Sequence, residues 1–419
     1  MNLKSKSCIV WDTGGWPYIA ERLAKDFGKV YYTSPLTPPE FPKSFAGLLG
    51  KGMRGVERLP ADEALRYADH VDLHVTTDVN QRGLQAMLRG RGYRVWGMGD
   101  ASDIETDRWK LGEVLRQHNL AVPERELIKG ADALEKYLRS EKDKWIKINH
   151  WRGDMETLHH ESWFTSESWF KMRLAEWGVA RHEMEFVAEE PIEAKEVGYD
   201  GPGVVDGEFC SPCLFGFEIK DAGYAGRIVD KEKLPPMIRE CNEKIAPYFK
   251  TSRGIYANEI RVHSKDEFYL TDPTCRFPSP PTQAICEAFT NLSEFIYEGA
   301  GGNLIAPTHD AKFVCVAIIE SHADNPRIEI PIQYPKEWYD FVKFRDVYFR
   351  DGKAHVLPQD IPVPQIGAVV GLGDTLKEAM EMAKEVADSV KGFGVEVNVK
   401  ALDKAQETID EAKKVGIDF

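Results

Sequence analysis

This chain of 419 residues has few cysteines, and its basic residues are outnumbered by its acidic residues. The 7 Cys residues are an odd number spread from Cys8 to Cys315, which is not a dense disulfide framework, and a chain of this length does not need one. Lys and Arg number 54 against 68 Asp and Glu, so the formal net charge is -14 and no overall positive field attracts nucleic acid or anionic membranes. We therefore expect a cytoplasmic protein without a nucleic-acid partner, in which any phosphate is held by a local site.

Long hydrophobic runs and internal repeats are also missing. The first apolar stretch, Cys8 to Trp11, follows two Lys residues but is too short for the core of a signal peptide or for a membrane span. The composition is 42% hydrophobic and 29% charged, which is ordinary for a soluble protein with enough apolar residues for two or three packed domains. We therefore expect no membrane partner.

The first hundred residues alternate between strand and helix patterns. Such alternation predicts a small α/β domain with a parallel sheet. Between Ser34 and Leu59 the sequence is rich in Pro and Gly, which predicts a long surface loop able to close over a ligand. The predicted strands are residues 7–11, 29–33, 71–76 and 93–96, and the predicted helices are 17–27, 61–69 and 80–90.

The middle of the chain reads as an antiparallel sheet, because its strand patterns are closely spaced and joined by short turns. Helix patterns at 105–119 and 130–139 precede it, and the last third predicts a small α+β unit. The strands expected in the middle are 144–148, 183–188, 194–198, 203–206, 213–219, 255–262 and 267–271. Those of the last third are 312–319, 345–349 and 365–371, with helices at 375–391 and 402–414.

In the segment FVAEEPIEAKE, residues 186–196, a strand ends in two carboxylates, Glu189 and Glu190, and the carboxylate of Glu196 follows seven residues after the first. A purine needs an acceptor for its amino group and a backbone N–H for a ring nitrogen, and a ribose needs a carboxylate for its hydroxyls. The segment therefore suits a nucleoside, although a solvated acidic turn is the plainer interpretation of the segment alone.

A hairpin pattern places two further carboxylates together. Glu259 lies on one predicted strand and Asp272 at the end of the next, across a tight turn, so pairing of the strands brings them close. Two close carboxylates repel unless a cation joins them, and Mg²⁺ prefers one or two carboxylates together with nucleotide phosphates. A structural hairpin with a surface pair is the alternative.

These motifs together resemble the ATP-grasp superfamily, and short blocks along nearly the whole chain are similar to its phosphoribosylamine-glycine ligases. The blocks include the junction WGMGDASDIETDRWK and the terminal segment QIGAVVGLGDTLKEAM. The resemblance implies an α/β plus α+β architecture. Its parts are a Rossmann-like pre-ATP-grasp domain at 1–103, an ATP-grasp core of two α+β subdomains at 104–305 with a lid subdomain at about 125–190, and a small C-terminal α/β domain at 306–419.

The resemblance also implies roles for individual residues. Glu189 and the Ile192 backbone would contact adenine and Glu196 the ribose, while Glu259 and Asp272 would bind Mg²⁺. The residues implied to contact phosphates are Arg108, Lys147 and Lys220, and the implied catalytic residues are Lys220 and Arg276.

The sequence departs from the superfamily pattern at three places. Thr274 stands where Asn is usual, Asp272 where Glu is usual, and the loop from His150 to Thr157 contains only Gly153 where the phosphate lid is typically glycine-rich. After Lys220 the chain has DAGYAGRIVD in place of the Gly- and Thr-rich substrate stretch, so we expect a different acceptor.

The expected function is an ATP- and Mg²⁺-dependent ligase that joins a small-molecule carboxylate to an amine through an acyl phosphate and releases ADP and phosphate. The expected assembly is a monomer or dimer. Two alternatives stay open: an ATP-binding protein without ligase activity, and an enzyme that acts on a hydroxyl, a thiol or a modified nucleotide.

Three other motifs favour structural interpretations. Cys210 and Cys213 have redox or half-zinc spacing but no second pair, and His159 with His160, which could touch substrate, reads as a pair on a helix surface. The glycines at 299–302 follow a helix pattern and read as its C-terminal cap.

Overall fold

The N-terminal part of the chain is a parallel sheet, as the alternating pattern predicts. The computed structural model describes residues 1–34, 47–150, 157–219, 222–322, 329–357 and 365–419. Within these ranges the sheet has the strand order β3-β2-β1-β4-β5, and every neighbouring pair in it is parallel. Its elements are β1 Ser7–Trp11, α1 Pro17–Ala24, β2 Lys29–Thr33, β3 Val56–Arg58, α2 Ala61–Ala64, β4 Leu73–Thr76, α3 Arg82–Gly90 and β5 Val95–Trp96.

The predicted surface loop between Ser34 and Leu59 is wrong at residues 56–58. The strand β3 forms there and pairs with β2, whereas residues 47–55 form turns in which Leu49 and Met53 are buried. Three residues after a glycine-rich turn are too few to show a strand period, so only pairing with β2 reveals β3. Residues 35–46 of this predicted loop lie outside the described residues.

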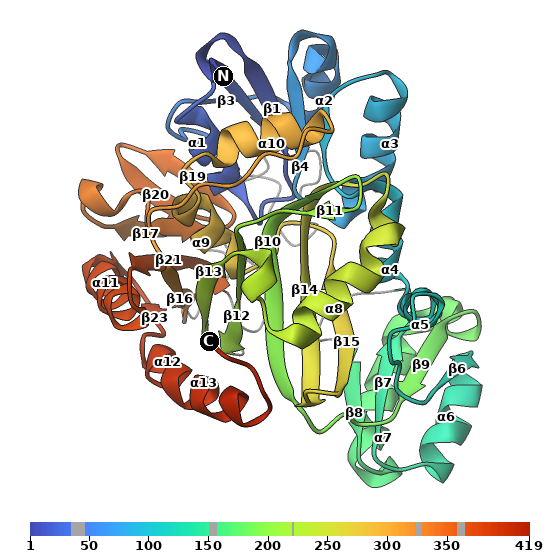
Figure 1. The fold of residues 1–419 in the computed structure, drawn as a ribbon. Coiled ribbons are helices and arrows are strands. Elements are labelled where there is room, and N and C mark those ends of the chain that lie inside the picture. Colours follow the sequence, from blue (N-terminus) through green and yellow to red (C-terminus); the bar gives the residue numbers. More distant parts are fainter. Residues whose placement is uncertain (35–46, 151–156, 220–221, 323–328, 358–364) are drawn as a thin grey trace.

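A large antiparallel sheet forms the centre of the molecule (Figure 1). Its main path in the described part of the chain is β15-β14-β10-β12-β13-β16-β21-β18, with β11 and β23 paired beside it. The β13–β16 pairing carries the sheet across residues 305 and 306, the predicted domain boundary. The bounds are β10 Lys195–Val205, β11 Glu208–Phe209, β12 Cys213–Ile219, β13 Gly223–Val229, β14 Arg253–Ser264, β15 Glu267–Thr274, β16 Phe313–Ser321, β18 Val342–Phe344, β21 Gln365–Gly373 and β23 Val395–Val397.

Strand β10 replaces two predicted strands, at 194–198 and 203–206. It runs without interruption over eleven residues and pairs with β14 along most of that length, with an irregular register between Gly201 and Val204. Pro202 and the glycines beside it hide the strand period, because Pro cannot donate to a sheet and Gly has no side chain to pack. The continuous strand carries Glu196 and Asp200 along one wall.

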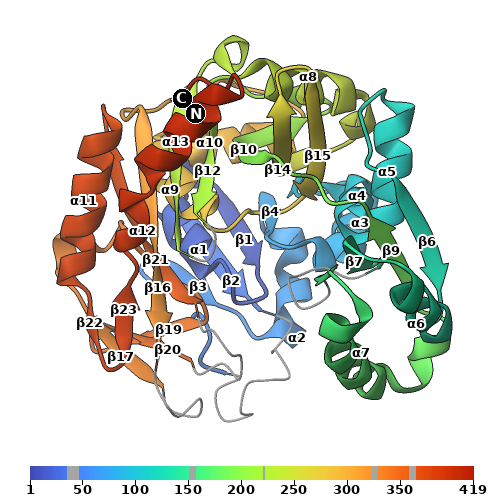
Figure 2. The ribbon, with the colours of Figure 1, turned by 90° about the horizontal axis from the view of Figure 1, so that it is seen from below.

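Two smaller antiparallel sheets complete the fold. The first, β6-β9-β7-β8, carries α6 and α7 and has its own core around Phe170 and Phe186. Figures 1 and 2 show it on the side of the molecule opposite α11, α12 and α13. Its elements are β6 Arg125–Lys129, α6 Ala131–Ser140, β7 Lys144–Ile148, β8 Thr157–His160, α7 Trp163–Trp177 and β9 Glu185–Glu189. The second sheet contains β17 Ile330–Gln333, β19 Val347–Arg350, β20 Lys353–Val356 and β22 Lys391–Gly392.

The helix predicted at 105–119 is divided at Asp107. The Asp107 side chain accepts a hydrogen bond of 2.9 Å from the backbone N–H of Lys110 and so starts a new helix, α5, with Arg108 as its first residue. The remaining helices are α4 Asp103–Thr106, α5 Arg108–Gln117, α8 Pro236–Ile245, α9 Pro281–Ala288, α10 Leu292–Ala300, α11 Leu376–Ser389, α12 Lys400–Asp403 and α13 Ala405–Lys414.

No helix in the described part of the chain is both long enough and apolar enough to cross a membrane. All seven cysteines are described, and each is buried with a free thiol. Burial raises the pKa of the Cys210 thiol to about 12, so neither it nor its buried neighbour Cys213 has the thiolate character of a reactive pair.

A buried ion pair joins α9, in the middle of the chain, to β18, in its last third. The Lys343 Nζ on β18 lies 2.6 Å from Glu287 Oε1 on α9, and both side chains are less than a tenth exposed. Burial opposes the charge on Lys343, but the Glu287 carboxylate outweighs it and raises the Lys343 pKa. Lys25, after α1, lies 2.9 Å from the same carboxylate.

We expect Glu287→Gln to lower the free energy of unfolding by about 3 kcal/mol, because it leaves the Lys343 charge buried without its partner. Equilibrium urea unfolding measures this change. Glu294→Gln is the matched control: its exposed pair with the N-terminal ammonium is worth less than about 1 kcal/mol. Equal losses in the two variants would contradict the importance of the buried pair.

Candidate active site

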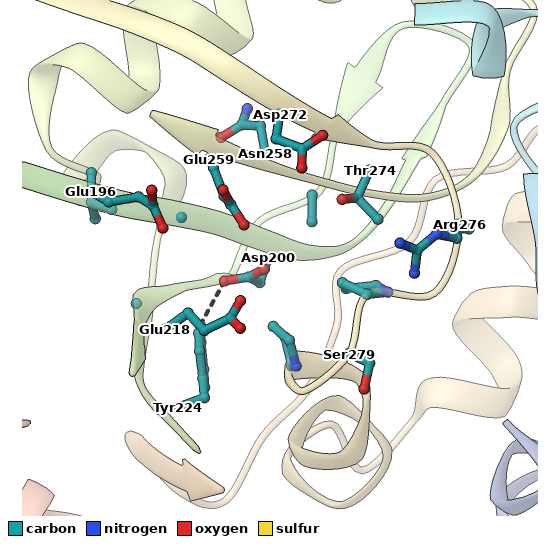
Figure 3. A pocket seen from close by; sticks show the side chains of 16 residues that line it. Glu196, Asp200, Glu218, Tyr224, Asn258, Glu259, Asp272, Thr274, Arg276 and Ser279 are labelled. Carbon is teal, nitrogen blue, oxygen red and sulfur yellow. Dashed lines mark hydrogen bonds between the residues drawn. The ribbon is translucent and has the colours of Figure 1, made fainter. Parts of the chain in front are cut away.

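A pocket opens on one face of the large sheet (Figure 3). Its walls come from β10, β12, β14 and β15, and its floor from the segment that leads into α9. Carboxylates dominate the lining, with Arg276 as a cation. The side chains labelled in Figure 3 are Glu196, Asp200, Glu218, Tyr224, Asn258, Glu259, Asp272, Thr274, Arg276 and Ser279.

The structure brings Glu259 and Asp272 together. They are direct cross-strand partners in the β14–β15 hairpin, as their spacing predicts. Burial, followed by the negative charges of Asp272 and Glu196, raises the pKa of Glu259 well above its usual range. Gly198 lies opposite Glu259 on β10, and a Cβ there would approach Asp200 Oδ2 to 3.2 Å, so the glycine keeps the space between these carboxylates open.

Two other predicted residues lie in the same pocket. Glu196 on β10 accepts a hydrogen bond of 2.9 Å from Arg261 Nη2 on the neighbouring strand. Arg276 donates from Nε to Glu105 Oε1 at 2.8 Å, and its guanidinium lies 5.7 Å from the Trp16 ring centre. The Glu105 carboxylate therefore holds Arg276 at the edge of the pocket.

Asp200, Glu218 and Tyr224 are among the pocket residues that sequence reasoning missed. Asp200 is buried and accepts a hydrogen bond of 2.7 Å from Tyr224 Oη. Burial raises its pKa to about 7, and the Tyr224 hydrogen bond opposes this rise. The signal in the sequence is a charged residue inside the apolar and glycine-rich run 197–205, and the β10–β12 pairing that brings Asp200 to Tyr224 joins strands that are not adjacent in the chain.

The described side chains do not form a complete metal cage. No group of three or more His, Cys, Asp or Glu residues in the described ranges is arranged to hold a metal ion. A pair of carboxylates is nevertheless enough where nucleotide phosphates and water supply the other oxygens, as is usual for Mg²⁺.

A second cluster lies on the small sheet. The Lys147 Nζ on β7 donates to Glu189 Oε2 on β9 at 2.7 Å, and Arg125 Nη1 lies 3.5 Å from the other Glu189 oxygen. Burial disfavours the ionised Glu189, but Lys147, Arg125 and the nearby Arg108 outweigh it and lower its pKa. The Nε atoms of Arg108 and Arg125 are buried without hydrogen-bond partners.

The two clusters are not parts of one cavity. Arg108, Lys147 and Glu189 do not line the pocket on the large sheet. Ile192 is half-buried in the segment that joins β9 to β10, between the clusters. Lys220 and residues 151–156 of the predicted phosphate lid lie outside the described residues. The predicted helix-surface pair is wrong: His159 and His160 both lie on strand β8. His159 is exposed, whereas His160 is buried, with its Nδ1 2.8 Å from Ser166 Oγ.

Comparison by sequence identifies no relative: no protein-family model matches the chain, and no curated protein matches it. Comparison of the fold identifies similar proteins. A phosphoribosylamine-glycine ligase from Thermotoga maritima superposes with a TM-score of 0.72 and 18% identity, covering 93% of this chain and 98% of that chain.

Two carboxylases are also similar. The biotin carboxylase domain of a 2-oxoglutarate carboxylase from Hydrogenobacter thermophilus, in complex with MgADP, has a TM-score of 0.68 and 11% identity and covers 98% of both chains. A biotin carboxylase from Campylobacter jejuni has a TM-score of 0.66 and 12% identity, covering 100% of this chain and 98% of that chain. The chain therefore has the fold of the ATP-grasp enzymes, as the resemblance of its motifs predicts.

Proposed function

We propose that this chain is an ATP- and Mg²⁺-dependent carboxylate-amine ligase that forms an amide through an acyl phosphate and releases ADP and phosphate. One observation carries the proposal: Glu259 and Asp272 face each other in a pocket that also holds Arg276, on the ATP-grasp fold. The complex of a similar carboxylase domain with MgADP supports the choice of nucleotide and metal.

The residues present fit Mg²⁺. Glu259 and Asp272 offer hard oxygen ligands, and the raised pKa of Glu259 reflects its burial and then the neighbouring negative charges, which a divalent cation would neutralise. When bound, Mg²⁺ would neutralise the phosphate oxygens as their charge changes. Thr274, which stands where Asn is usual, does not affect the carboxylate pair, because the proposed metal ligands are Glu259 and Asp272 alone.

The second cluster is proposed to hold the nucleotide. Arg108 and Lys147 would contact phosphates, together with Lys220, and the buried Nε of Arg108 is a hydrogen-bond donor that still needs an acceptor. Glu189, the Ile192 backbone and Glu196 would hold adenine and ribose. Glu189 can accept a hydrogen bond from adenine only with lone pairs that do not already accept from Lys147.

The proposed reaction mainly requires that the reacting groups are aligned and that the charge on the phosphates is neutralised. A substrate carboxylate oxygen attacks the γ-phosphorus of ATP, the bond to the bridging oxygen of ADP breaks, and an acyl phosphate forms. An amine then attacks the acyl carbon and expels phosphate, which leaves the amide. The Arg276 guanidinium, held by Glu105, is placed to bind the carboxylate or the γ-phosphate, and Lys220 is proposed to assist it.

The acidic wall indicates which amine is accepted. Asp200 and Glu218 lie in the same pocket as Glu259 and Asp272, and Tyr224 fixes the Asp200 carboxyl group. A wall of this sign favours a positively charged amine over a neutral or anionic acceptor. This is the feature of the chain that supports an altered acceptor site.

We expect ADP and phosphate to form in equal amounts when the protein is given ATP, Mg²⁺ and a suitable carboxylate with an amine, beginning with glycine and phosphoribosylamine. Glu259→Gln should lower turnover by about 100-fold or more, because it removes a ligand charge at nearly constant shape. Glu267→Gln, exposed on the same hairpin, is the control and should stay active. Formation of AMP and pyrophosphate would contradict the mechanism, and tight ATP binding with no ADP release across a broad substrate panel would favour a binding protein.

We expect MgATP binding to release protons and to strengthen as the pH rises towards and through the raised pKa of Glu259. Below that pKa the metal-free carboxyl group holds a proton, which coordination of Mg²⁺ must displace. Calorimetry in two buffers of different ionisation enthalpy counts the protons. Glu259→Gln should remove most of this release and Glu267→Gln should not. Equal proton release from both variants would assign it to another group.

We expect Asp200→Asn, assayed above the Asp200 pKa of about 7, to raise the KM for a cationic amine by about tenfold while kcat changes less, because one negative charge near the ammonium is lost. The Asn side chain still accepts from Tyr224, so the wall keeps its shape. Steady-state kinetics with the amine varied at saturating ATP measure the effect. Glu208→Gln, exposed and away from this pocket, is the matched control. A change in the KM for ATP instead would place Asp200 at the nucleotide.

A further inference from the structure

Asn149 joins the small sheet to the start of α5. It follows β7 directly in the chain and is 2% exposed. The first N–H groups of an α-helix have no partner within the helix, and Asn149 supplies partners for two of them. Its backbone carbonyl accepts from the Arg108 N–H at 3.1 Å, and its Oδ1 accepts from the Trp109 N–H at 2.7 Å. One buried residue of the small sheet therefore holds the first two N–H groups of α5.

The Asn149 amide is itself held in one orientation. Its Nδ2 donates to Glu185 Oε2 on β9 at 3.0 Å, and its backbone N–H donates to the Glu185 carbonyl at 2.8 Å. The Trp109 N–H needs an acceptor, whereas the Glu185 carboxylate needs a donor. An amide offers both from one side chain, which a carboxylate or an apolar side chain does not.

Arg125 on β6 holds the carbonyl groups of the same two residues. Its Nη1 donates to the Arg108 carbonyl at 2.9 Å and its Nη2 to the Trp109 carbonyl, and its guanidinium lies 4.7 Å from the Trp109 ring centre. Gly112 of α5 makes room for this guanidinium, because a Cβ there would overlap Arg125 Nη2. The start of α5 is therefore attached to the small sheet through both its N–H and its C=O groups.

The geometry of the basic cluster depends on this attachment. Arg108 is the first residue of α5, whereas Lys147 lies on β7, two residues before Asn149. The hydrogen bonds of Asn149 therefore set the distance between the backbones of Arg108 and Lys147. A phosphate chain that contacts both cations needs that distance to be fixed, because charge-assisted hydrogen bonds are short, about 2.7–2.9 Å.

We infer that Asn149 is a positioning residue of the proposed nucleotide site, which acts through Arg108 by fixing its backbone relative to Lys147. The inference rests on the proposed contacts of Arg108 and Lys147 with nucleotide phosphates, and it does not require ligase turnover. Asn149 is itself buried and is not proposed to touch the nucleotide. Its loss should therefore weaken the binding of phosphates and leave the binding of a nucleoside unchanged.

The experiment measures the affinity of the full chain for MgATP and for adenosine by isothermal titration calorimetry. Asn149→Ala removes the side-chain acceptor, Arg108→Met removes the guanidinium, and the double variant shows whether the two residues act together. Asn303→Ala is the matched control, because the exposed Asn303 also donates to a glutamate, Glu298, at 2.8 Å but lies outside the basic cluster. Circular dichroism checks that each variant is folded.

We expect Asn149→Ala to weaken MgATP binding by about tenfold, while adenosine affinity stays within about twofold. Arg108→Met should weaken MgATP binding at least as much. Adding Asn149→Ala to it should cost less than about twofold more, because the residue through which Asn149 acts is already lost. Asn303→Ala should bind both probes as the wild type does. Unchanged MgATP affinity in Asn149→Ala, additive losses in the double variant, or equal losses for the two probes would overturn the inference.

An exchange of the two polar groups gives a second test, which also decides if Asn149→Ala does not fold. Asn149→Asp keeps an acceptor for the Trp109 N–H but turns its other oxygen towards the Glu185 carboxylate, so it should weaken MgATP binding by about tenfold. Adding Glu185→Gln gives that oxygen an amide donor and should restore the affinity to within about threefold of the wild type. Failure of this rescue in a folded double variant contradicts the inference.

The same measurements separate this inference from the ligase proposal, because they record binding and not turnover. A wild type that binds MgATP but forms no ADP contradicts the ligase proposal alone, and the affinities of the variants still decide the role of Asn149. A wild type that does not bind MgATP overturns both.

Discussion

The opposition of Glu259 and Asp272 is the constraint on which the candidate active site depends. Like charges placed directly across two strands weaken a hairpin, and burial of Glu259 adds to the cost of its charge. The strands tolerate this because β14 lies inside the sheet, where Ile260 and Val262 are fully buried. The two carboxylates therefore favour a cation at a fixed position, because the paired strands hold them there without rearrangement.

The acidic pocket and the basic cluster lie in different parts of the structure. The large sheet carries the carboxylates of the pocket, whereas the small sheet carries Lys147 and Arg125 around Glu189, with Arg108 of α5 nearby. One short segment connects them, since Glu189 ends β9 and Glu196 lies near the start of β10. A nucleotide that needs carboxylates for its metal and ribose and cations for its phosphates would draw on both sheets, which explains why neither cluster is a complete site alone.

The two faces of the large sheet carry different kinds of side chain. Along β10 the side chains alternate between the acidic pocket and an aromatic layer on the opposite face, with Asp200 on one side and Tyr199, packed against Phe209, on the other. The glycines of β10 and β12 keep the first face open, whereas large aromatic side chains fill most of the second. The two faces thus differ in chemistry although they share the same backbone.

The sequence by itself determined the features that depend on local pattern: the parallel N-terminal sheet, the β14–β15 hairpin, and the pairing of Glu259 with Asp272, because a tight turn fixes the register of two adjacent strands. Only the tertiary structure decided the rest. Strand β3, the continuity of β10, and the meeting of Asp200 with Tyr224 all depend on partners distant in the chain. Neither period nor spacing carries that information, because long-range strand order is set by how whole surfaces pack and not by any short run of residues.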